Sequence, residues 1–264
     1  MRKKGNLNKN SRLRRGIFLL PNLFTSMNLF CGFYAVIAAI DGKFIAAAVA
    51  VIIAGVFDNF DGKIARATRT TSKFGVEYDS LADLISFGLA PGLMIYLWAL
   101  KPLGRIGWLA AFLFMACGAL RLARFNTQVS SISSDYFVGL PIPAAAGMNA
   151  VTVLIYHKFS LNVQSNPVLI LLMLYALSFL MVSTIKYSSF KKPELFHKMK
   201  FDVLVAFMLI FIFIAAQPSI ALFFLGVAYV GSGPFNLLSH HKKLKLGKAE
   251  IPRAEGHTSN PVKQ

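Results

Sequence analysis

Long apolar runs, separated by short polar connections, fill most of the chain. A run of about 20 apolar residues can cross the hydrocarbon core of a bilayer as one helix. Lipid offers no partners to backbone N–H and C=O groups, so runs of this kind must form helices. We therefore predict an all-α, polytopic membrane helix bundle with about eight transmembrane helices, near residues 20–40, 44–61, 83–100, 106–126, 139–157, 167–185, 202–216 and 219–238.

The composition agrees with a membrane bundle. Hydrophobic residues make up 56% of the 264 residues, and the mean hydropathy is +0.58, above that of ordinary soluble domains. The first run is long and has no small-residue cleavage site, so we expect it to be retained as a helix. We expect a basic cytoplasmic N-terminal segment (1–19), one transmembrane domain that carries the functional site (20–240) and a disordered basic cytoplasmic tail (241–264).

The net charge of +17 is distributed unevenly over this topology. In an eight-span arrangement, 24 of the 28 Lys and Arg residues lie on the side of the two termini, and the other side has Lys43, Lys101, Arg105 and Lys158. Because basic residues are enriched in cytoplasmic loops, we predict that both termini lie on the cytoplasmic face of the inner membrane, beside anionic lipid headgroups. No basic soluble domain remains, which argues against nucleic acid as a partner.

Four carboxylates stand between the second and third runs: Asp58, Asp61, Asp79 and Asp83. Residues three or four apart share one face of a helix, so Asp58 lies on the same helix face as Asp61, and Asp79 lies on the same helix face as Asp83. Clustered anions at membrane depth repel one another strongly, and cations that prefer oxygen ligands, Mg²⁺ or Mn²⁺, relieve that repulsion. The pattern predicts a metal-dependent site at a membrane surface. The alternative is that the acids only form ion pairs with the neighbouring bases Lys63, Arg66, Arg69 and Lys73.

Two glycines and an arginine accompany the acids. Gly62 and Gly75 leave space for a phosphorylated ligand to approach the backbone, and Arg66 offers parallel donors to a phosphate. The spacing D-x-x-D-G-x-x-A-R-x8-G-x3-D-x3-D resembles the signature of the CDP-alcohol phosphatidyltransferases, and all eight of its fixed residues are present.

The resemblance implies a role for each residue of the signature. It implies that metal ions are held by Asp58, Asp61, Asp79 and Asp83. Asp83 would also act as the catalytic base that takes a proton from the acceptor hydroxyl. The resemblance places CDP-diacylglycerol against Gly62, Ala65, Arg66, Gly75 and, as weaker candidates, Asn22 and Thr25.

Three further segments indicate which branch of this family the chain resembles. They are residues 86–91 (Ser-Phe-Gly-Leu-Ala-Pro), 121–126 (Arg-Leu-Ala-Arg-Phe-Asn) and 139–147 (Gly-Leu-Pro-Ile-Pro-Ala-Ala-Ala-Gly). Together they are similar to the membrane-integral bacterial phosphatidylserine synthases within this family, and the similarity covers about residues 15–190. The alternative for segments 86–91 and 139–147 is helix packing, because small residues spaced four apart let helices approach closely.

This branch of the family implies transfer of the phosphatidyl group of CDP-diacylglycerol to L-serine, with release of CMP, by a homodimer in the membrane. Serine carries a carboxylate, and Arg121 and Arg124 are the basic residues best placed by topology to bind it. The alternative for both arginines is snorkelling toward lipid headgroups. Three other functions stay open: the same transfer to glycerol 3-phosphate or another alcohol, transport of divalent cations, and an inactive scaffold. The acids cluster at one end of the spans instead of at the midplane, which argues against a transporter.

Overall fold

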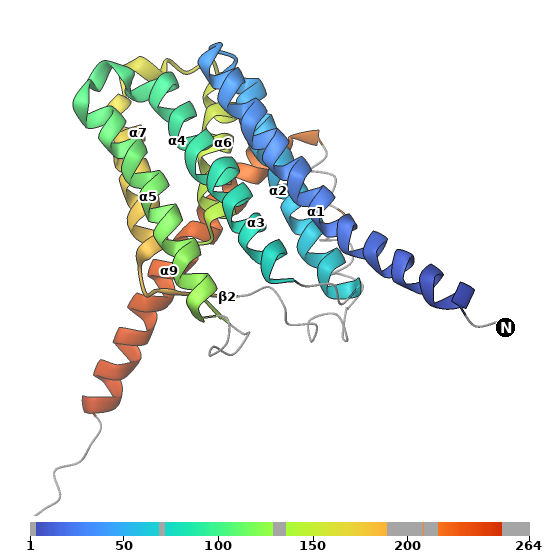
Figure 1. Cartoon of the computed structure of the whole chain (residues 1–264). Helices are drawn as coiled ribbons and strands as arrows, with labels where there is room; N and C mark the ends of the chain where they lie inside the picture. The colour runs from blue at the N-terminus through green and yellow to red at the C-terminus, as the bar shows by residue number, and fades with distance from the viewer. Residues whose placement is uncertain (1–3, 69–71, 129–135, 189–207, 209–215, 250–264) are drawn as a thin grey trace, which may run out of the picture.

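The computed structural model describes residues 4–68, 72–128, 136–188, 208 and 216–249. These residues form a bundle of helices that run from one end of the molecule to the other (Figure 1). The helices are α1 (Lys4–Ile40), α2 (Phe44–Thr68), α3 (Lys73–Asp83), α4 (Ala90–Ile95), α5 (Arg105–Gln128), α6 (Ile142–Lys158), α7 (Pro167–Val182) and α9 (Pro218–Ala249). A short 3-10 turn, η4 (Val163–Ser165), precedes α7. The predicted helical architecture is confirmed.

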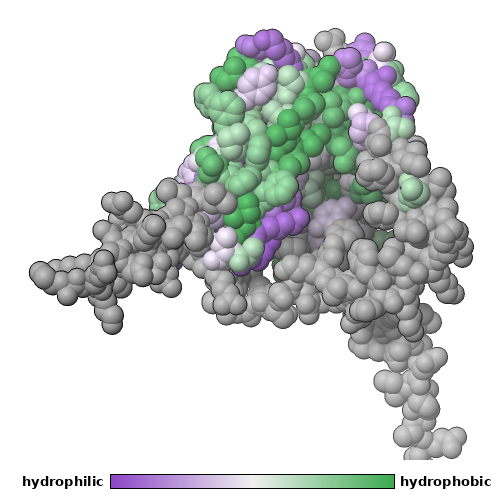
Figure 2. Space-filling model, turned by 90° about the vertical axis from the view of Figure 1, so that its right-hand side faces the viewer, coloured by the Kyte–Doolittle hydropathy of each residue, from purple (hydrophilic) through white to green (hydrophobic). Residues whose placement is uncertain are grey.

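The number of membrane spans is only partly settled. Five helices among the described residues are long and apolar enough to cross a membrane: Pro21–Ile40, Phe44–Thr68, Lys73–Leu103, Arg105–Thr127 and Pro218–Phe235. Helices α6 and α7 are apolar but have 17 and 16 residues, fewer than the roughly 20 of a typical span. The predicted run 202–216 lies outside the described residues except at two positions, so the count of about eight stays a prediction. The long apolar helices fit a membrane-integral protein, and Figure 2 shows hydrophobic surface between two more hydrophilic regions.

The third predicted span begins earlier than expected, at Lys73 instead of near residue 83. From α3 the chain continues through a π-helical stretch η1 (Leu84–Leu89), α4, a second π stretch η2 (Tyr96–Leu100) and a 3-10 turn η3 (Lys101–Leu103). Pro91 has no N–H, so the carbonyl four residues earlier loses its helical donor and the preceding turn widens. Asp79 and Asp83 therefore lie within a long helical rod, above its first turns.

Helices α1 and α2 form an antiparallel pair with a close interface. The buried residues along it are mostly alanines, Ala35, Ala38 and Ala39 on α1 and Ala47 and Ala54 on α2, which let the two backbones approach. Gly42 allows the tight turn between them, since its φ of +75° is the left-handed conformation that favours glycine. The antiparallel arrangement brings the C-terminal turns of α2, which carry two of the acids, beside the residues that follow Pro21 in α1.

A short two-stranded ladder departs from the all-α expectation. Strand β1 (Tyr136–Val138) pairs antiparallel with β2 (Lys186–Ser188). Next to it, Gly139 donates its N–H to the Ile185 carbonyl over 2.8 Å and adopts a φ of +78°. Strands of three residues carry too little alternation to be recognised in a sequence.

The two ends of the described chain leave the bundle at the same end. In Figure 1 the first turns of α1 and the last turns of α9 project beyond the bundle at the end where β2 lies. This arrangement supports the predicted placement of both termini on one side of the membrane.

Candidate active site

Three of the four predicted acids form one cluster. Asp58 and Asp61 lie on α2, and Asp79 lies on α3. One carboxylate oxygen from each of the three lies within 4.8 Å of the others. The i, i+3 spacing puts both α2 acids on one face, and α3 supplies the third carboxylate. The structure therefore brings together the oxygen atoms that a divalent cation needs.

Asp83 lies beside this cluster. The residue is 7% exposed, and its Oδ1 accepts a hydrogen bond of 3.0 Å from Nδ2 of Asn28. Asp58 lies within hydrogen-bonding reach of Asp83. Asp83 is therefore held by Asn28 of α1 next to the three clustered acids.

Helix α1 supports the acids with two polar side chains. Thr25 donates from Oγ1 to Oδ2 of Asp61 over 3.0 Å, and Asn28 holds Asp83 as described. The resemblance suggested Thr25 as a phosphate ligand, whereas here it contacts a carboxylate. Sequence reasoning did not find Asn28. Its position three residues after Thr25, on the same face of an apolar helix, was the available signal.

Among the described residues, no basic side chain forms an ion pair with any of the four acids. The one ion pair in this part of the chain is between Asp41 and Lys43, at the opposite end of α1 and α2. Oδ1 of Asp79 is buried and has no hydrogen-bond partner among the described residues. Arg69, one of the bases in the ion-pair alternative, lies outside the described residues. An unpartnered buried carboxylate oxygen in a group of three acids fits a bound divalent cation better than a set of ion pairs.

We call the region of Asn22, Thr25, Gly62 and Gly75 the α1 side of the acids. A Cβ added at Gly75 would be 3.5 Å from Oδ1 of Asn22 and 3.2 Å from Oγ of Ser72. Ser72 caps α3, because its Oγ accepts the Gly75 N–H over 3.0 Å. Gly75 and Asn22 are therefore neighbours across α3 and α1.

The α2 residues of the signature lie next to this pair of helices. A Cβ added at Gly62 would be 3.5 Å from Nη1 of Arg66, and Ala65 lies on the same turns of α2. Arg66 also acts electrostatically on Asp61. The structure thus places the predicted residues Gly62, Ala65 and Arg66 beside the acids.

The two arginines of α5 have different surroundings. Arg124 donates from Nη1 to the backbone carbonyl of Val182 over 3.1 Å, which ties α5 to the last turn of α7. Arg121 is partly buried, and its positive charge acts on Asp83. Its Nε has no hydrogen-bond partner among the described residues. Arg121 is therefore within electrostatic range of the acids, whereas Arg124 holds two helices together. We call the region of Arg121 the α5 side of the acids.

Two of the segments that narrowed the resemblance have packing contacts. Ser86 is buried and donates to the Asn28 carbonyl over 3.0 Å, and a Cβ on Gly32 would overlap with Ser86. A Cβ on Gly92 would be 3.2 Å from the Ala111 carbonyl oxygen. These contacts support the packing interpretation of residues 86–91. Asn126, in the second segment, donates to Oγ of Ser80 over 3.0 Å and so ties α5 to α3.

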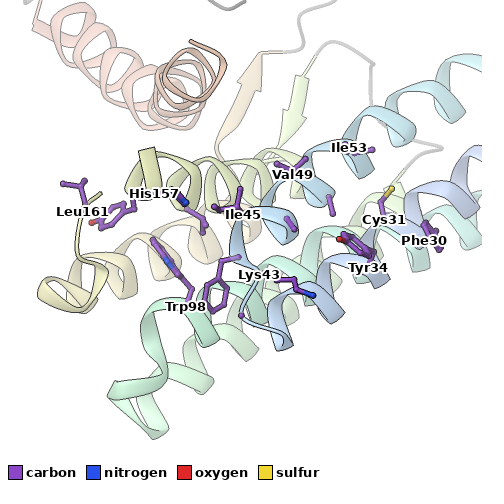
Figure 3. A pocket seen from close by; sticks show the side chains of 16 residues that line it. Phe30, Cys31, Tyr34, Lys43, Ile45, Val49, Ile53, Trp98, His157 and Leu161 are labelled. Atoms are coloured by element: carbon purple, nitrogen blue, oxygen red, sulfur yellow. The ribbon is translucent and has the colours of Figure 1, made fainter. Parts of the chain in front are cut away.

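Of two cavities in the described part of the bundle, the larger is remote from the acids. It has about 880 Å³ and lies near the turn between α1 and α2, with Lys43, Trp98 and His157 in its lining (Figure 3). The smaller one, of about 560 Å³, lies between α2, α6 and α9. Asn59, Lys63 and Tyr229 contribute to its lining, which is otherwise mostly apolar. The acids and the smaller cavity share the C-terminal turns of α2, so the chemistry points to this end of the molecule.

Comparison with known proteins agrees with the geometry. A sequence profile of the CDP-alcohol phosphatidyltransferases matches residues 18–182. The chain belongs to the CDP-alcohol phosphatidyltransferase family. Divalent-metal dependence is general in this family, and the acidic cluster is in keeping with it.

Several relatives carry a more specific name. The chain is 39% identical over 207 residues to the CDP-diacylglycerol–serine O-phosphatidyltransferase of Helicobacter pylori, covering 78% of this chain and 86% of the relative. It is 40% identical over 174 residues to the Bacillus subtilis protein of the same name, covering 66% and 92%. It is also 36% identical over 170 residues to the archaetidylserine synthase of Methanothermobacter thermautotrophicus, covering 64% and 69%.

Proposed function

We propose that this protein transfers the phosphatidyl group of CDP-diacylglycerol to the hydroxyl of L-serine, giving phosphatidylserine and CMP. The observation that carries the proposal is the cluster of Asp58, Asp61 and Asp79, whose oxygens lie within 4.8 Å of one another inside the family signature. Relatives at 39% and 40% identity carry the name of this activity. Both the site and the similarity point to the same reaction.

The three clustered acids are the proposed ligands of Mg²⁺ or Mn²⁺. The cation would neutralise charge on the pyrophosphate of CDP-diacylglycerol and on the departing CMP. Thr25 fixes the orientation of Asp61 by its hydrogen bond, as partners of metal ligands generally do. We place the CDP moiety on the α1 side, where Gly62, Ala65 and Gly75 leave room for the cytidine and Arg66 faces a phosphate, with Asn22 beside them.

Asp83 is the proposed base. The serine oxygen forms a bond to the phosphorus of the phosphatidyl group as the bond from that phosphorus to the CMP oxygen breaks, and the hydroxyl proton passes to a carboxylate. Asp83 is not one of the three clustered acids, and the charge of Arg121 acts on it. Asn28 fixes the orientation of its carboxylate.

Serine binding is proposed for the α5 side. Arg121 is within electrostatic range of Asp83 and has a buried Nε without a partner among the described residues, which suits a carboxylate. Arg124 already donates to the Val182 carbonyl. We therefore place Arg121 ahead of Arg124 as the residue that binds the carboxylate of serine.

The lipid substrate accounts for a site at one end of the bundle. Its acyl chains remain in the bilayer, and the apolar cavity between α2, α6 and α9 opens beside Lys63 at the level of the acids. We propose that this end faces the cytoplasm, at the inner membrane, with both termini on the same side, and that the protein acts as a homodimer. Labelling of single cysteines at Lys73 and Lys101 tests the orientation: we expect Lys73→Cys to react from the cytoplasmic side and Lys101→Cys from the outer side. Reaction of both from one side would refute this topology.

Release of CMP by the purified protein tests the reaction. We expect CMP to appear when CDP-diacylglycerol, Mn²⁺ and serine are all present. Glycerol 3-phosphate and inositol, supplied in place of serine, test the other acceptors. Turnover with glycerol 3-phosphate but not with serine would retain the family chemistry and overturn the proposed acceptor. Absence of CMP release with every alcohol would favour a transporter or an inactive scaffold.

A further inference from the structure

The larger cavity lies at the end of the bundle opposite the acids and has no part in the proposed reaction. It has about 880 Å³, and residues of α1, α2, η2 and α6 line it. On α2 the lining extends from Phe44 to Ile53, which is about 14 Å of helix at 1.5 Å per residue. One leaflet supplies half of a hydrocarbon core that is roughly 30 Å thick. The cavity therefore has about the depth of one leaflet.

The polar and the apolar residues of the lining lie at different ends of the cavity. Lys43 and His157 lie toward the turn between α1 and α2, whereas Phe30 lies at the far end, along α1 (Figure 3). Trp98 and Tyr156, both in the lining, meet edge to face with ring centroids 5.3 Å apart. Tryptophan and tyrosine are enriched where the hydrocarbon meets the headgroups. The cavity thus has a polar mouth and an apolar interior, and a phospholipid has the same two parts.

The charge at the mouth suits an anionic headgroup. Among the described residues that line the cavity, Lys43 is the one with a full charge, and none is an acid. Lys43 forms an ion pair with Asp41 over 3.1 Å, but the two side chains are 67% and 48% exposed. Exposed pairs of this kind contribute little to stability, so the ammonium group is available to a phosphate. His157 offers a ring N–H donor at the same mouth.

We propose that this cavity binds one anionic phospholipid from the leaflet opposite the acids. Lys43 and His157 bind its phosphate, and one of its acyl chains lies along α2 between α1 and α6. A free phosphate ion would leave the apolar interior unfilled, which is why a lipid is the expected occupant. The site is separate from the proposed donor and acceptor sites, and the inference does not depend on the proposed function. A bound lipid would join the hairpin of α1 and α2 to α6 at the end remote from the acids.

Fluorescence of Trp98 tests the proposal, because this residue lines the cavity. The chain has two tryptophans, so Trp108→Phe leaves Trp98 as the only indole. This protein is placed in phosphatidylcholine vesicles that contain a small fraction of lipid with bromine atoms, which quench tryptophan, near the head end of an acyl chain. We expect brominated phosphatidylglycerol to quench Trp98 at about a fivefold lower fraction than brominated phosphatidylcholine, the effect of one lysine on an anionic lipid.

Two variants separate the cavity from the general charge of the surface. Lys43→Gln removes the charge at the mouth and should abolish the preference for phosphatidylglycerol. Lys101→Gln is the matched control, because Lys101 is an exposed lysine at the same end that is not part of the lining. We expect the control to keep the fivefold preference. Equal loss in the two variants would attribute the preference to surface charge and overturn the site.

A third variant tests the position of the acyl chain. Val49→Phe adds bulk to the lining of the cavity and should remove the extra quenching by brominated phosphatidylglycerol, with circular dichroism as the check that the protein is folded. Unchanged quenching in a folded Val49→Phe protein would show that the chain lies elsewhere. Equal quenching by the two lipids in the protein without these three changes, or a preference that persists in Lys43→Gln, would overturn the proposal as a whole.

Discussion

The α1 side and the α5 side of the acidic cluster are built from different kinds of contact. On the α1 side, Thr25 and Asn28 donate hydrogen bonds of 3.0 Å to Asp61 and Asp83, and the residues that form it lie within 22–83 of the chain. On the α5 side, Arg121 acts on Asp83 only through its charge, without a hydrogen bond between the two side chains. The difference indicates that the proposed metal and nucleotide part of the site is fixed by direct hydrogen bonds, whereas the proposed acceptor part depends on how α5 packs beside the acids.

The largest expected loss of activity follows from replacing one of the proposed metal ligands, which lie between the α1 side and the α5 side. Asp61→Asn removes a charged ligand from the cluster, and metal ions stabilise charge in such reactions by several kcal/mol. We expect CMP release to fall more than about 1,000-fold, which corresponds to roughly 4 kcal/mol. Binding of Mn²⁺, followed by electron paramagnetic resonance, should weaken in parallel. A folded Asp61→Asn protein with the turnover of the parent would show that the cluster is not the catalytic metal site.

Asp83 lies between the α1 side and the α5 side of the acids. Its replacement tests whether Asp83 acts as a general base or as a metal ligand. Asp83→Asn keeps the size of the side chain and an oxygen for Asn28. We expect kcat to fall roughly 100-fold, the lower range for loss of a general base, while Mn²⁺ affinity stays within a few fold of the parent. Loss of Mn²⁺ binding as complete as in Asp61→Asn would make Asp83 a plain metal ligand.

The positions of the acids on the α1 side could be predicted from the sequence because helix spacing and the family signature relate them to one another. Asp58 and Asp61 share a helix face by their spacing, and the structure brings Asp79 within 4.8 Å of them as the signature implies. Asn28 was missed because a single asparagine in an apolar helix gives no sign of its partner, which is 55 positions away.

The α5 side could not be predicted to the same extent. Spacing treats Arg121 and Arg124 alike, three residues apart near one helix end, and only the packing of α7 shows that Arg124 has a backbone partner. The start of the third helical rod was misplaced for a related reason, since the polar first turns of α3 carry no apolar run.

A smaller effect is expected from the threonine that supports Asp61. Thr25→Val keeps the shape of the side chain and removes the hydrogen bond to Oδ2. Loss of a partner of a metal ligand typically costs about 10- to 100-fold in metal affinity, so the Mn²⁺ concentration for half-maximal activity should rise about 10-fold.

The neighbouring Ser26 provides the control for Thr25. Its Oγ donates to the Asn22 carbonyl over 2.9 Å and lies 2.9 Å from the Tyr78 hydroxyl, and Ser26 itself is exposed. We expect Ser26→Ala to leave the Mn²⁺ dependence as it is in the parent. Equal shifts in the two variants would mean that the first turns of α1 act on the site only through general packing.

The smallest effect on activity is expected for Arg124, the arginine of α5 that has a structural partner. Arg124→Ala removes the bond to the Val182 carbonyl and so leaves one carbonyl at the end of α7 without its donor. A hydrogen bond to a charged group contributes about 1.5–3 kcal/mol, which predicts a melting temperature lower by roughly 3–10 °C. The KM for serine should stay within about threefold of the parent, because Arg121 and not Arg124 is the residue proposed to bind the carboxylate of serine. A rise of more than about 10-fold in the KM for serine, with an unchanged melting temperature, would indicate that Arg124 binds the carboxylate of serine. Arg124 would then not be the purely structural arginine of α5.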